Sequence, residues 1–341
     1  MNPAEIKLGA YPHELGTRFG LFATESDSCS VVLVDESNAV LREIEMKSLG
    51  DGYFELDIDG VGPGDLYRFR VGEHAIPDPR ARFLPRGVHG PAQVVAANSF
   101  IHRHASPRSE GLADQIFYEL HIGTFTPEGT YEAALAKLPE LVELGVTTLE
   151  ILPLSSFPGG RGWGYDGVAH FAPDPSYGSP DALREFIDAA HGFGLLVVLD
   201  VVYNHFGPAG NYLSLSSSRY FDASRQTRWG TPPAFSDAPM RRYVIENALH
   251  WLDDFRFDGL RLDAAHELFD ESPEHIVQEL VRRVRELSET KFVVIEDDRN
   301  DARLKNEWGI DATWADDFHH AVHVLFTGEQ GGYYEDYAPS L

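Results

Sequence analysis

Two acidic residues on neighbouring apolar segments could act together as a nucleophile and an acid. The segment 259–263 has the alternation of a strand, which places Arg261 and Asp263 on the same side. A guanidinium beside a carboxylate favours the ionised form, and this suits Asp263 to a nucleophile. The apolar run 292–295 ends in Glu296, with two further acidic residues next to it. Burial and neighbouring negative charge raise the pKa of a carboxyl, which suits Glu296 to a general acid.

The expected distance between the two carboxyls predicts a reaction type. Carboxyls at matching depth on adjacent parallel strands would lie roughly 5 Å apart, because strands are spaced by about 4.8 Å. Such a separation is typical of a retaining glycosidase, which forms a covalent glycosyl-enzyme intermediate while its acid becomes a base. The alternative is that Asp263 and Glu296 form ion pairs at the ends of their strands and take no part in catalysis. For either residue taken alone, the sequence favours neither interpretation over the other.

Two other segments carry side chains suited to binding a sugar. Asp200 is the one polar residue of the apolar run 195–202, near its end, and His205 follows the run. An imidazole at that position can hold a sugar hydroxyl. Trp163 and Tyr165 lie among glycines, which allow an aromatic face to be presented to a pyranose ring. The alternatives are a loop histidine satisfied by its neighbours and a tryptophan packed in the core.

The elements that must position these residues alternate between strand and helix from residue 115 onward. Strands are predicted at 115–125, 146–152, 195–202, 257–265, 292–295 and 310–315, and helices at 131–144, 180–193, 240–255, 272–288 and 316–326. Acidic residues fall at the carboxyl ends of several of these strands, as in barrel enzymes, whereas an open doubly wound sheet gathers ligands at one switch point. We therefore predict an α/β fold, an incomplete (β/α)8 TIM-type barrel with about six strand-helix units.

The first hundred residues have a different texture. Short runs rich in Val, Phe, Tyr and Thr are separated by Gly and Pro turns, which predicts an immunoglobulin-like β-sandwich over residues 1–100. The polar stretch 101–114 is predicted to be a linker, and residues 115–341 form the partial barrel.

Composition argues against several partners and locations. The sequence has 28 Lys and Arg against 54 Asp and Glu, a net charge of −26 that repels phosphate backbones and anionic lipid headgroups. We therefore expect no nucleic-acid and no membrane partner. One Cys cannot form an internal disulfide, and the sequence shows neither a signal peptide nor an apolar run of about 18 residues. We expect a cytoplasmic protein.

Three segments, 200–205, 259–266 and 295–300, resemble the first three signature regions of the α-amylase superfamily, glycoside hydrolase family 13, in order and spacing. Within that family, segments 119–129, 163–168, 296–300 and 314–320 are more similar to the malto-oligosyltrehalose trehalohydrolase branch than to glycogen branching enzyme. The resemblance covers nearly the whole chain, including the β-sandwich.

The resemblance implies a role for each candidate residue. Asp263 would be the nucleophile, Glu296 the acid/base and Arg261 the partner of the nucleophile. The other residues expected to bind substrate are Trp163, Tyr165, Asp200, His205 and His266. The implied reaction is hydrolysis of the α-1,4 bond that joins a malto-oligosaccharide to a terminal trehalose unit. Two alternatives stay open: a glucanotransferase like the branching enzymes, and a glucan-binding protein without catalysis.

The sequence departs from the family pattern in one respect that bears on activity. The family uses a third carboxylate, the Asp of an Asn-His-Asp segment after a seventh strand, and no such segment occurs here. Residues 115–341 leave no room for strands seven and eight, so we expect a C-terminally truncated part of a longer enzyme. This chain is expected to hydrolyse poorly or not at all. Asp316 or Asp317 is a weaker candidate for the missing role.

The last predicted helix carries side chains that could bind a metal. Asp316, His319, His320 and His323 lie close together, and zinc sites use the spacing of four between His319 and His323. The HExxH pattern is absent, however, so hydrogen-bonded imidazoles are favoured and no metal or cofactor is expected.

Overall fold

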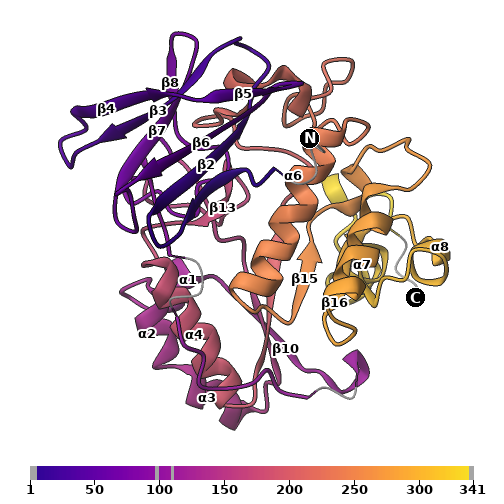
Figure 1. The fold of residues 1–341 in the computed structure, drawn as a ribbon. Helices are drawn as coiled ribbons and strands as arrows, with labels where there is room; N and C mark the ends of the chain where they lie inside the picture. Colours follow the sequence, from indigo (N-terminus) through magenta and orange to yellow (C-terminus); the bar gives the residue numbers. More distant parts are fainter. Residues whose placement is uncertain (1–5, 97–99, 109–110, 338–341) are drawn as a thin grey trace.

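The computed structural model describes residues 6–96, 100–108 and 111–337. Two antiparallel sheets in its N-terminal part form a β-sandwich, as predicted (Figure 1). Phe19, Val31 and Phe69 point between the sheets and have no exposed surface. One sheet has the order β1 (Gly9–Pro12), β2 (Gly16–Phe22), β6 (Tyr53–Asp59), β5 (Lys47–Gly50). The other has the order β4 (Val40–Glu45), β3 (Cys29–Val34), β7 (Leu66–Val71), β8 (His74–Ile76), with β9 (Ala92–Gln93) also paired to β7.

The second part is built on a six-stranded parallel sheet. Its order is β10 (Phe117–Leu120), β11 (Thr148–Ile151), β14 (Leu196–Val201), β15 (Gly259–Leu262), β16 (Phe292–Asp297), β17 (Ala312–Ala315). The strands follow one another in the order of the chain, so the sheet curls as part of a barrel and does not reverse at a switch point. All six residues of β14 are buried, as expected for a strand covered on both faces. The predicted incomplete barrel with six strand-helix units is confirmed.

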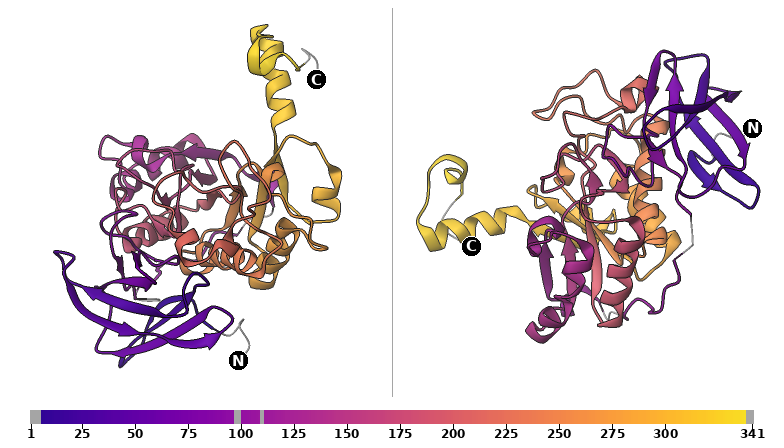
Figure 2. Two further views of the ribbon diagram at one scale, coloured as in Figure 1. Left: turned by 90° about the horizontal axis from the view of Figure 1, so that it is seen from above. Right: turned by 90° about the vertical axis from the view of Figure 1, so that its left-hand side faces the viewer.

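The longer helices lie near their predicted bounds, although the helix predicted over 272–288 begins only at Ile276 and the one predicted over 240–255 begins at Ala238. Pro180 opens α4 (Pro180–Gly192), and the hydroxyl of Ser179 accepts a hydrogen bond from the backbone N–H of Ala182. The other long helices are α6 (Ala238–Leu249), α7 (Ile276–Leu287) and α9 (Asp316–Thr327). Figure 2 shows α9 projecting away from the body of the molecule.

Several predicted elements are shorter or divided. The strand expected over 115–125 ends at Leu120, and α1 (Ile122–Phe125) follows it. The helix expected over 131–144 is divided into α2 (Tyr131–Leu135) and α3 (Leu138–Leu144), because Pro139 lacks an N–H and fits only the first turn of a helix. Helix α6 continues as a π-helical turn over His250–Asp254. Some short elements are not predicted from the sequence. They are the strand pair β12 (Ser155–Ser156) and β13 (Ala169–Pro173) and the helices α5 (Leu213–Ser216) and α8 (Ala302–Asn306).

The sandwich and the barrel share a hydrophobic core. Four buried residues of the sandwich part, Ile6, Leu8, Phe22 and Tyr53, belong to the same apolar cluster as the inner residues of the barrel helices. Arg80 is buried at this boundary, pairs with Glu246 on α6, and lies 5.2 Å from the ring of Phe171 and 5.3 Å from that of Tyr243.

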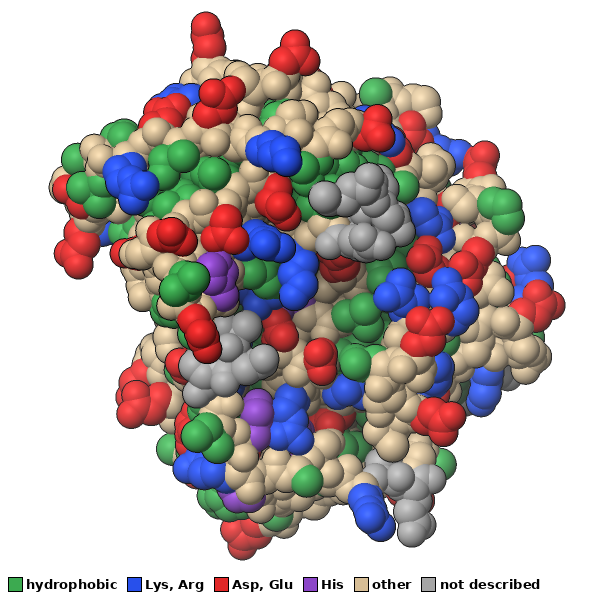
Figure 3. Space-filling model, viewed as in Figure 1, with side chains coloured by type: hydrophobic (Ala, Val, Ile, Leu, Met, Phe, Trp, Pro, Cys, Tyr) green, Lys and Arg blue, Asp and Glu red, His purple; other side chains and the backbone are tan. Residues whose placement is uncertain are grey.

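The beginning of the predicted linker lies against the barrel. The backbone N–H groups of Arg103 and His104 donate to Oδ1 of Asp188 on α4, at 2.8 and 3.0 Å, and Asp188 is fully buried. On the face shown in Figure 3, acidic and basic side chains are interspersed. No helix within the described ranges is long and apolar enough to cross a membrane.

Candidate active site

Arg261 lies between three carboxylates at the carboxyl end of the parallel sheet. Its Nη1 donates to Oδ2 of Asp200 and to Oδ1 of Asp263, each at 2.8 Å. Its Nη2 forms an ion pair with Oε2 of Glu296, also at 2.8 Å. Asp200 is opposite Arg261 in the β14–β15 register, so both side chains face the inside of the curled sheet. The structure thus brings together four of the predicted site residues.

Asp263 and Glu296 lie level with one another across two neighbouring strands. Leu262 is opposite Ile295, and Asp263, the residue just beyond the end of β15, is therefore level with Glu296 in β16. Ala264 then adopts the left-handed conformation, with φ +40°, and its N–H donates to Oε2 of Glu296 at 2.9 Å. Such backbone is uncommon for a residue other than glycine, and it is found at sites where geometry is imposed for function. The guanidinium of Arg261 contacts both carboxyls. The separation of roughly 5 Å expected between the carboxyls of Asp263 and Glu296 stays a prediction.

Burial outweighs the guanidinium in its effect on the pKa of two of these carboxyls, Asp200 and Asp263. Burial raises the pKa of Asp200 to about 8, although Arg261 and the hydroxyl of Tyr165 act in the opposite direction. The pKa of Asp263 is also raised, with burial as the main cause and Arg261 opposing it. Arg261 therefore favours the ionised form of Asp263, as expected, while the loss of hydration on burial acts against it and is the larger of the two effects.

Tyr165 contacts one of the carboxylates, and His205 contacts the backbone of Tyr165. The hydroxyl of Tyr165 donates to Oδ2 of Asp200 at 2.9 Å. The ring of His205 contacts the backbone C=O of Tyr165 through Nε2 at 2.9 Å and the amide of Asn204 through Nδ1 at 2.7 Å. Burial lowers the pKa of His205, and its ring stacks on Trp229 with 5.1 Å between centroids. Both ring nitrogens have partners in the protein, as in the alternative of a satisfied loop histidine.

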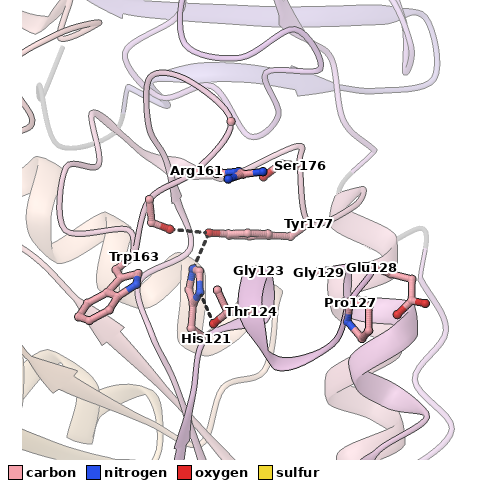
Figure 4. Close-up of a pocket in the computed structure, with 12 residues that line it drawn as sticks. His121, Gly123, Thr124, Pro127, Glu128, Gly129, Arg161, Trp163, Ser176 and Tyr177 are labelled. Carbon is pink, nitrogen blue, oxygen red and sulfur yellow. Dashed lines mark hydrogen bonds between the residues drawn. The ribbon is translucent and has the colours of Figure 1, made fainter.

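The other two predicted residues, His266 and Trp163, have other neighbours. His266 lies in a short 3-10 turn after Asp263, and its Nδ1 is 3.7 Å from the Oδ1 of Asp298. The side chain of Trp163 is 68% exposed, so the alternative that it packs in the core is wrong. It lines a cavity separate from the carboxylates (Figure 4).

One buried acid of the site was missed from the sequence. Glu150 in β11 is 2% exposed, and burial raises its pKa to about 7. It accepts a hydrogen bond from Nε1 of Trp314 at 3.3 Å, and Trp314 is opposite Glu296 in the β16–β17 register. The sequence does contain a sign of this contact, because Glu150 is a single charged residue inside an apolar strand, and such a residue is usually buried only when it is paired.

The residues weighed as metal ligands or as a third carboxylate have other neighbours. Within the described ranges, no group of three or more His, Cys, Asp or Glu is arranged to hold a metal ion. His323 contacts Glu329 at 2.9 Å and stacks on Tyr334. Asp316 opens α9 at the carboxyl end of β17, and burial together with the negative charge of Glu296 raises its pKa.

Comparison with known proteins agrees with this architecture. Residues 98–231 match the alpha amylase catalytic domain family, and residues 7–84 match carbohydrate-binding module 48, the isoamylase N-terminal domain. The malto-oligosyltrehalose trehalohydrolase of Deinococcus radiodurans is 48% identical over 333 residues, which cover 97% of this chain and 54% of that protein. The enzyme of the same name from Saccharolobus solfataricus is 43% identical over 302 residues, 86% of this chain and 53% of that protein.

A solved structure shows the same fold at high similarity. The crystal structure of a putative alpha amylase from Salmonella typhimurium superposes with a TM-score of 0.91 at 43% identity, covering 97% of this chain and 57% of that one. A branching enzyme from Burkholderia thailandensis is less similar, at 32% identity over 76% of this chain. The chain spans about half the length of the curated trehalohydrolases it matches. One part of the chain thus matches the alpha amylase catalytic domain, preceded by a part that matches carbohydrate-binding module 48, and over most of its length the chain is a relative of the malto-oligosyltrehalose trehalohydrolases.

Proposed function

We propose that the protein is a retaining glycoside hydrolase that acts on malto-oligosyltrehalose. It would cleave the α-1,4 bond next to the terminal trehalose unit and release trehalose. The observation that carries this proposal is the Asp263–Glu296 pair on one guanidinium, in a chain 48% identical to a protein named for that reaction. The substrate is a neutral glucan, whose binding a net charge of −26 does not oppose. A cytoplasmic location belongs to the same proposal.

In the first proposed step, a carboxylate oxygen of Asp263 attacks the anomeric carbon, and the bond from that carbon to the trehalose oxygen breaks. Glu296 gives its proton to the departing oxygen, which leaves with the bonding electron pair. A glycosyl ester on Asp263 results. Glu296, now ionised, accepts a proton from water, and the hydroxide oxygen attacks the same carbon and regenerates Asp263.

The surrounding residues would position these two. Arg261 fixes both carboxyls through separate nitrogens, and Asp200 orients that guanidinium from the other side. The hydroxyl of Tyr165 borders the same space, where a sugar ring would contact it. His205 holds the backbone of Tyr165, and we propose that it and His266 also contact the sugar.

Turnover by the 341-residue chain is expected to be slow. No Asn-His-Asp segment occurs in its sequence, so the third carboxylate that steadies the charged transition state in the family pattern is not supplied by such a segment. An assay that detects a single glycosylation event therefore tests the chemistry better than a steady-state rate.

The test is covalent labelling with 5-fluoro-α-glucosyl fluoride, whose fluoride leaves without an acid. We expect the intact mass to rise by one fluoroglucosyl unit, on a peptide that contains Asp263. Asp263→Asn should not be labelled, whereas Glu296→Gln should be labelled and lose the adduct more slowly, because Glu296 activates the water. Labelling of another residue, or none in the parent chain, would contradict the retaining mechanism.

The two alternatives give different results. A glucanotransferase would change the linkage pattern of amylose, seen by iodine staining, without releasing trehalose. A glucan-binding protein without catalysis would bind amylose, form no adduct and be unaffected by Glu296→Gln.

A further inference from the structure

We propose that Glu150 is a positioning residue for the reaction of Glu296. It holds the indole of Trp314 across the inside of the curled sheet, and Trp314 in turn holds the strand next to Glu296. The role of Glu296 as acid and base, on which this inference rests, belongs to the proposed function. Glu150 lies in β11 and Trp314 in β17, and Nε1 of Trp314 donates to Oε1 of Glu150 at 3.3 Å.

The hydrogen bond between Glu150 and Trp314 joins strands that are not neighbours. Three strands, β14, β15 and β16, lie between β11 and β17 in the order of the sheet. In a flat sheet, four strand spacings would put the two backbones about 19 Å apart. The side chains therefore meet only because the sheet curls, and their hydrogen bond fastens the second strand of the sheet to the last one from the inside.

Trp314 is held by an apolar contact as well. Its ring centroid lies 5.2 Å from that of Phe117 on β10, in an edge-to-face arrangement. Both rings pack against a cluster inside the sheet that includes Val198 and Val294. These two valines come two residues before Asp200 and Glu296 in their strands, so they face the same side one layer deeper. An indole N–H in such surroundings needs an acceptor, and Glu150 provides it.

Trp314 is also the direct neighbour of Glu296, because the two residues are opposite one another in the β16–β17 register. In the described part of the chain, β17 is the last strand of the sheet and pairs with β16 alone. It has only four residues, so the anchor that Glu150 gives to Trp314 limits how far this strand can shift. On its other side, Glu296 contacts Arg261 and the N–H of Ala264. Its carboxyl thus lies between fixed partners.

The charges around Glu150 keep its carboxyl neutral in acid and let it ionise near neutral pH. Burial is the main cause that raises its pKa to about 7, and Glu119 on β10 and Glu296 on β16 act in the same direction. Arg261 on β15 and the hydrogen bond from Trp314 act against them. From β14, the residue opposite Glu150 is apolar. Both forms of the carboxyl accept a hydrogen bond from the indole, and the ionised form accepts the stronger one.

The first measurement compares the two steps of labelling with 5-fluoro-α-glucosyl fluoride at pH 6. Formation of the adduct needs no acid, whereas loss of the adduct needs Glu296 as a base. We expect Glu150→Leu, which removes the acceptor, to slow the loss of the adduct at least about tenfold and to change the labelling rate less than about twofold. Trp314→Phe should do the same. The double variant should be no slower than either single one, because the two side chains act as one unit.

Two controls separate positioning from loss of stability. Glu150→Gln keeps an acceptor, and at pH 6, where Glu150 is mostly neutral in the parent, it should lose the adduct at the rate of the parent. Trp308→Phe changes another half-buried indole, which stacks on His275, and should leave both steps unchanged. A variant that only unfolds more easily would slow both steps together.

The indole N–H signal of Trp314 reports its contact with Glu150 without any turnover. In ¹⁵N spectra of the parent, this signal is identified by its absence in Trp314→Phe. It should shift as the pH passes about 7, because its acceptor ionises. In Glu150→Gln it should not shift over this range. Titration of another carboxyl would shift the signal in both proteins.

The catalytic proposal and the positioning proposal can fail separately. If Glu150→Leu loses the adduct as fast as the parent, or if both steps slow equally, the positioning role is overturned and Asp263 remains the nucleophile. A parent chain that is not labelled would contradict the catalytic proposal, and the positioning role would fall with it. The indole signal would still decide whether Glu150 holds Trp314, and equal titration curves in the parent and Glu150→Gln would show that it does not.

Discussion

Arg261 contacts three carboxylates at once, and this makes the planar fork of its guanidinium more important than its charge. A lysine at this position presents one compact charge that cannot contact Asp200, Asp263 and Glu296 together. We expect Arg261→Lys to lower the rate of labelling at Asp263 at least about a hundredfold and to reduce the free energy of unfolding by about 3 kcal/mol.

The control for this prediction is Arg282→Lys. Arg282 also contacts two carboxylates, those of Glu274 and Glu286, but its side chain is 48% exposed. Exposed ion pairs contribute little, so this substitution should change stability by less than about 1 kcal/mol. Equal effects of the two substitutions on urea denaturation and on labelling would contradict the role of Arg261.

Glu150 should make stability depend on pH. Its pKa rises from 4.5 in the unfolded chain to about 7 in the folded one, so the folded protein binds more protons between these values. The free energy of unfolding therefore falls as the pH rises through this window. Glu150→Gln carries no titrating proton and keeps an acceptor for Trp314. We expect its Tm to equal that of the parent near pH 5 and to exceed it at pH 8.

Glu36 provides the comparison, because its side chain is exposed where that of Glu150 is buried. Glu36→Gln should have the Tm profile of the parent at every pH. A Glu150→Gln profile that runs parallel to that of the parent from pH 5 to pH 8 would show that Glu150 does not titrate in this range.

The sequence was enough to predict which residues meet around Arg261. It was not enough to predict the pKa values of their carboxyls. The alternation in 259–263 placed Arg261 and Asp263 on one side of a strand, and the structure has them in contact. The net direction of the pKa of Asp263 depends on how much neighbouring strands and Tyr165 cover it, and no local pattern reports that burial. Glu150 was missed for the same reason, because its partner Trp314 lies 164 residues away.

At the scale of elements, the loop from β12 to β13 is set by one glycine. Gly164 and Gly159 both have positive φ, +91° and +89°, but only Gly164 has backbone within reach of an added Cβ, the C=O of Pro153. We expect Gly164→Ala to displace Tyr165 from Asp200, to lower labelling at Asp263 by about tenfold or more, and to reduce stability by about 2 kcal/mol or more.

Gly159→Ala is the matched control, because it carries the same backbone strain in open space. It should cost about 1 kcal/mol and leave labelling unchanged. Similar losses of labelling in both variants would mean that strain in the loop, and not contact with Pro153, controls the site.

Elements with a long periodic pattern were predictable, and short ones were not. The apolar run of β14 and the Ser179-Pro180 start of α4 appear in the structure where expected. Helix α8 has five residues and the strand β12 two, too few for either period to be seen. The division between α2 and α3 could have been predicted from Pro139, because a proline fits only the first turn of a helix and so marks the start of α3.

At the scale of the whole molecule, Arg80 fastens the sandwich to the barrel. Its side chain is 4% exposed and lies between Glu246 and two aromatic rings of the barrel. We expect Arg80→Met to reduce the free energy of unfolding by about 1–3 kcal/mol and to make the 101–114 stretch more sensitive to protease. Arg18→Met, which changes a 51% exposed arginine of the same sandwich, should leave both unchanged. Equal protease sensitivity of the two variants would contradict this role of Arg80.

The shared core has a further consequence for a chain that has been cut. Ile6, Leu8, Phe22 and Tyr53 pack with barrel residues, and Asp188 holds the linker by its backbone, so the covalent connection is one of several attachments between the two parts. A protein nicked once within 101–114 should still elute as a single particle of unchanged size and separate into two fragments only in denaturant. The two parts should then reassociate when mixed, as two folded pieces that complement each other.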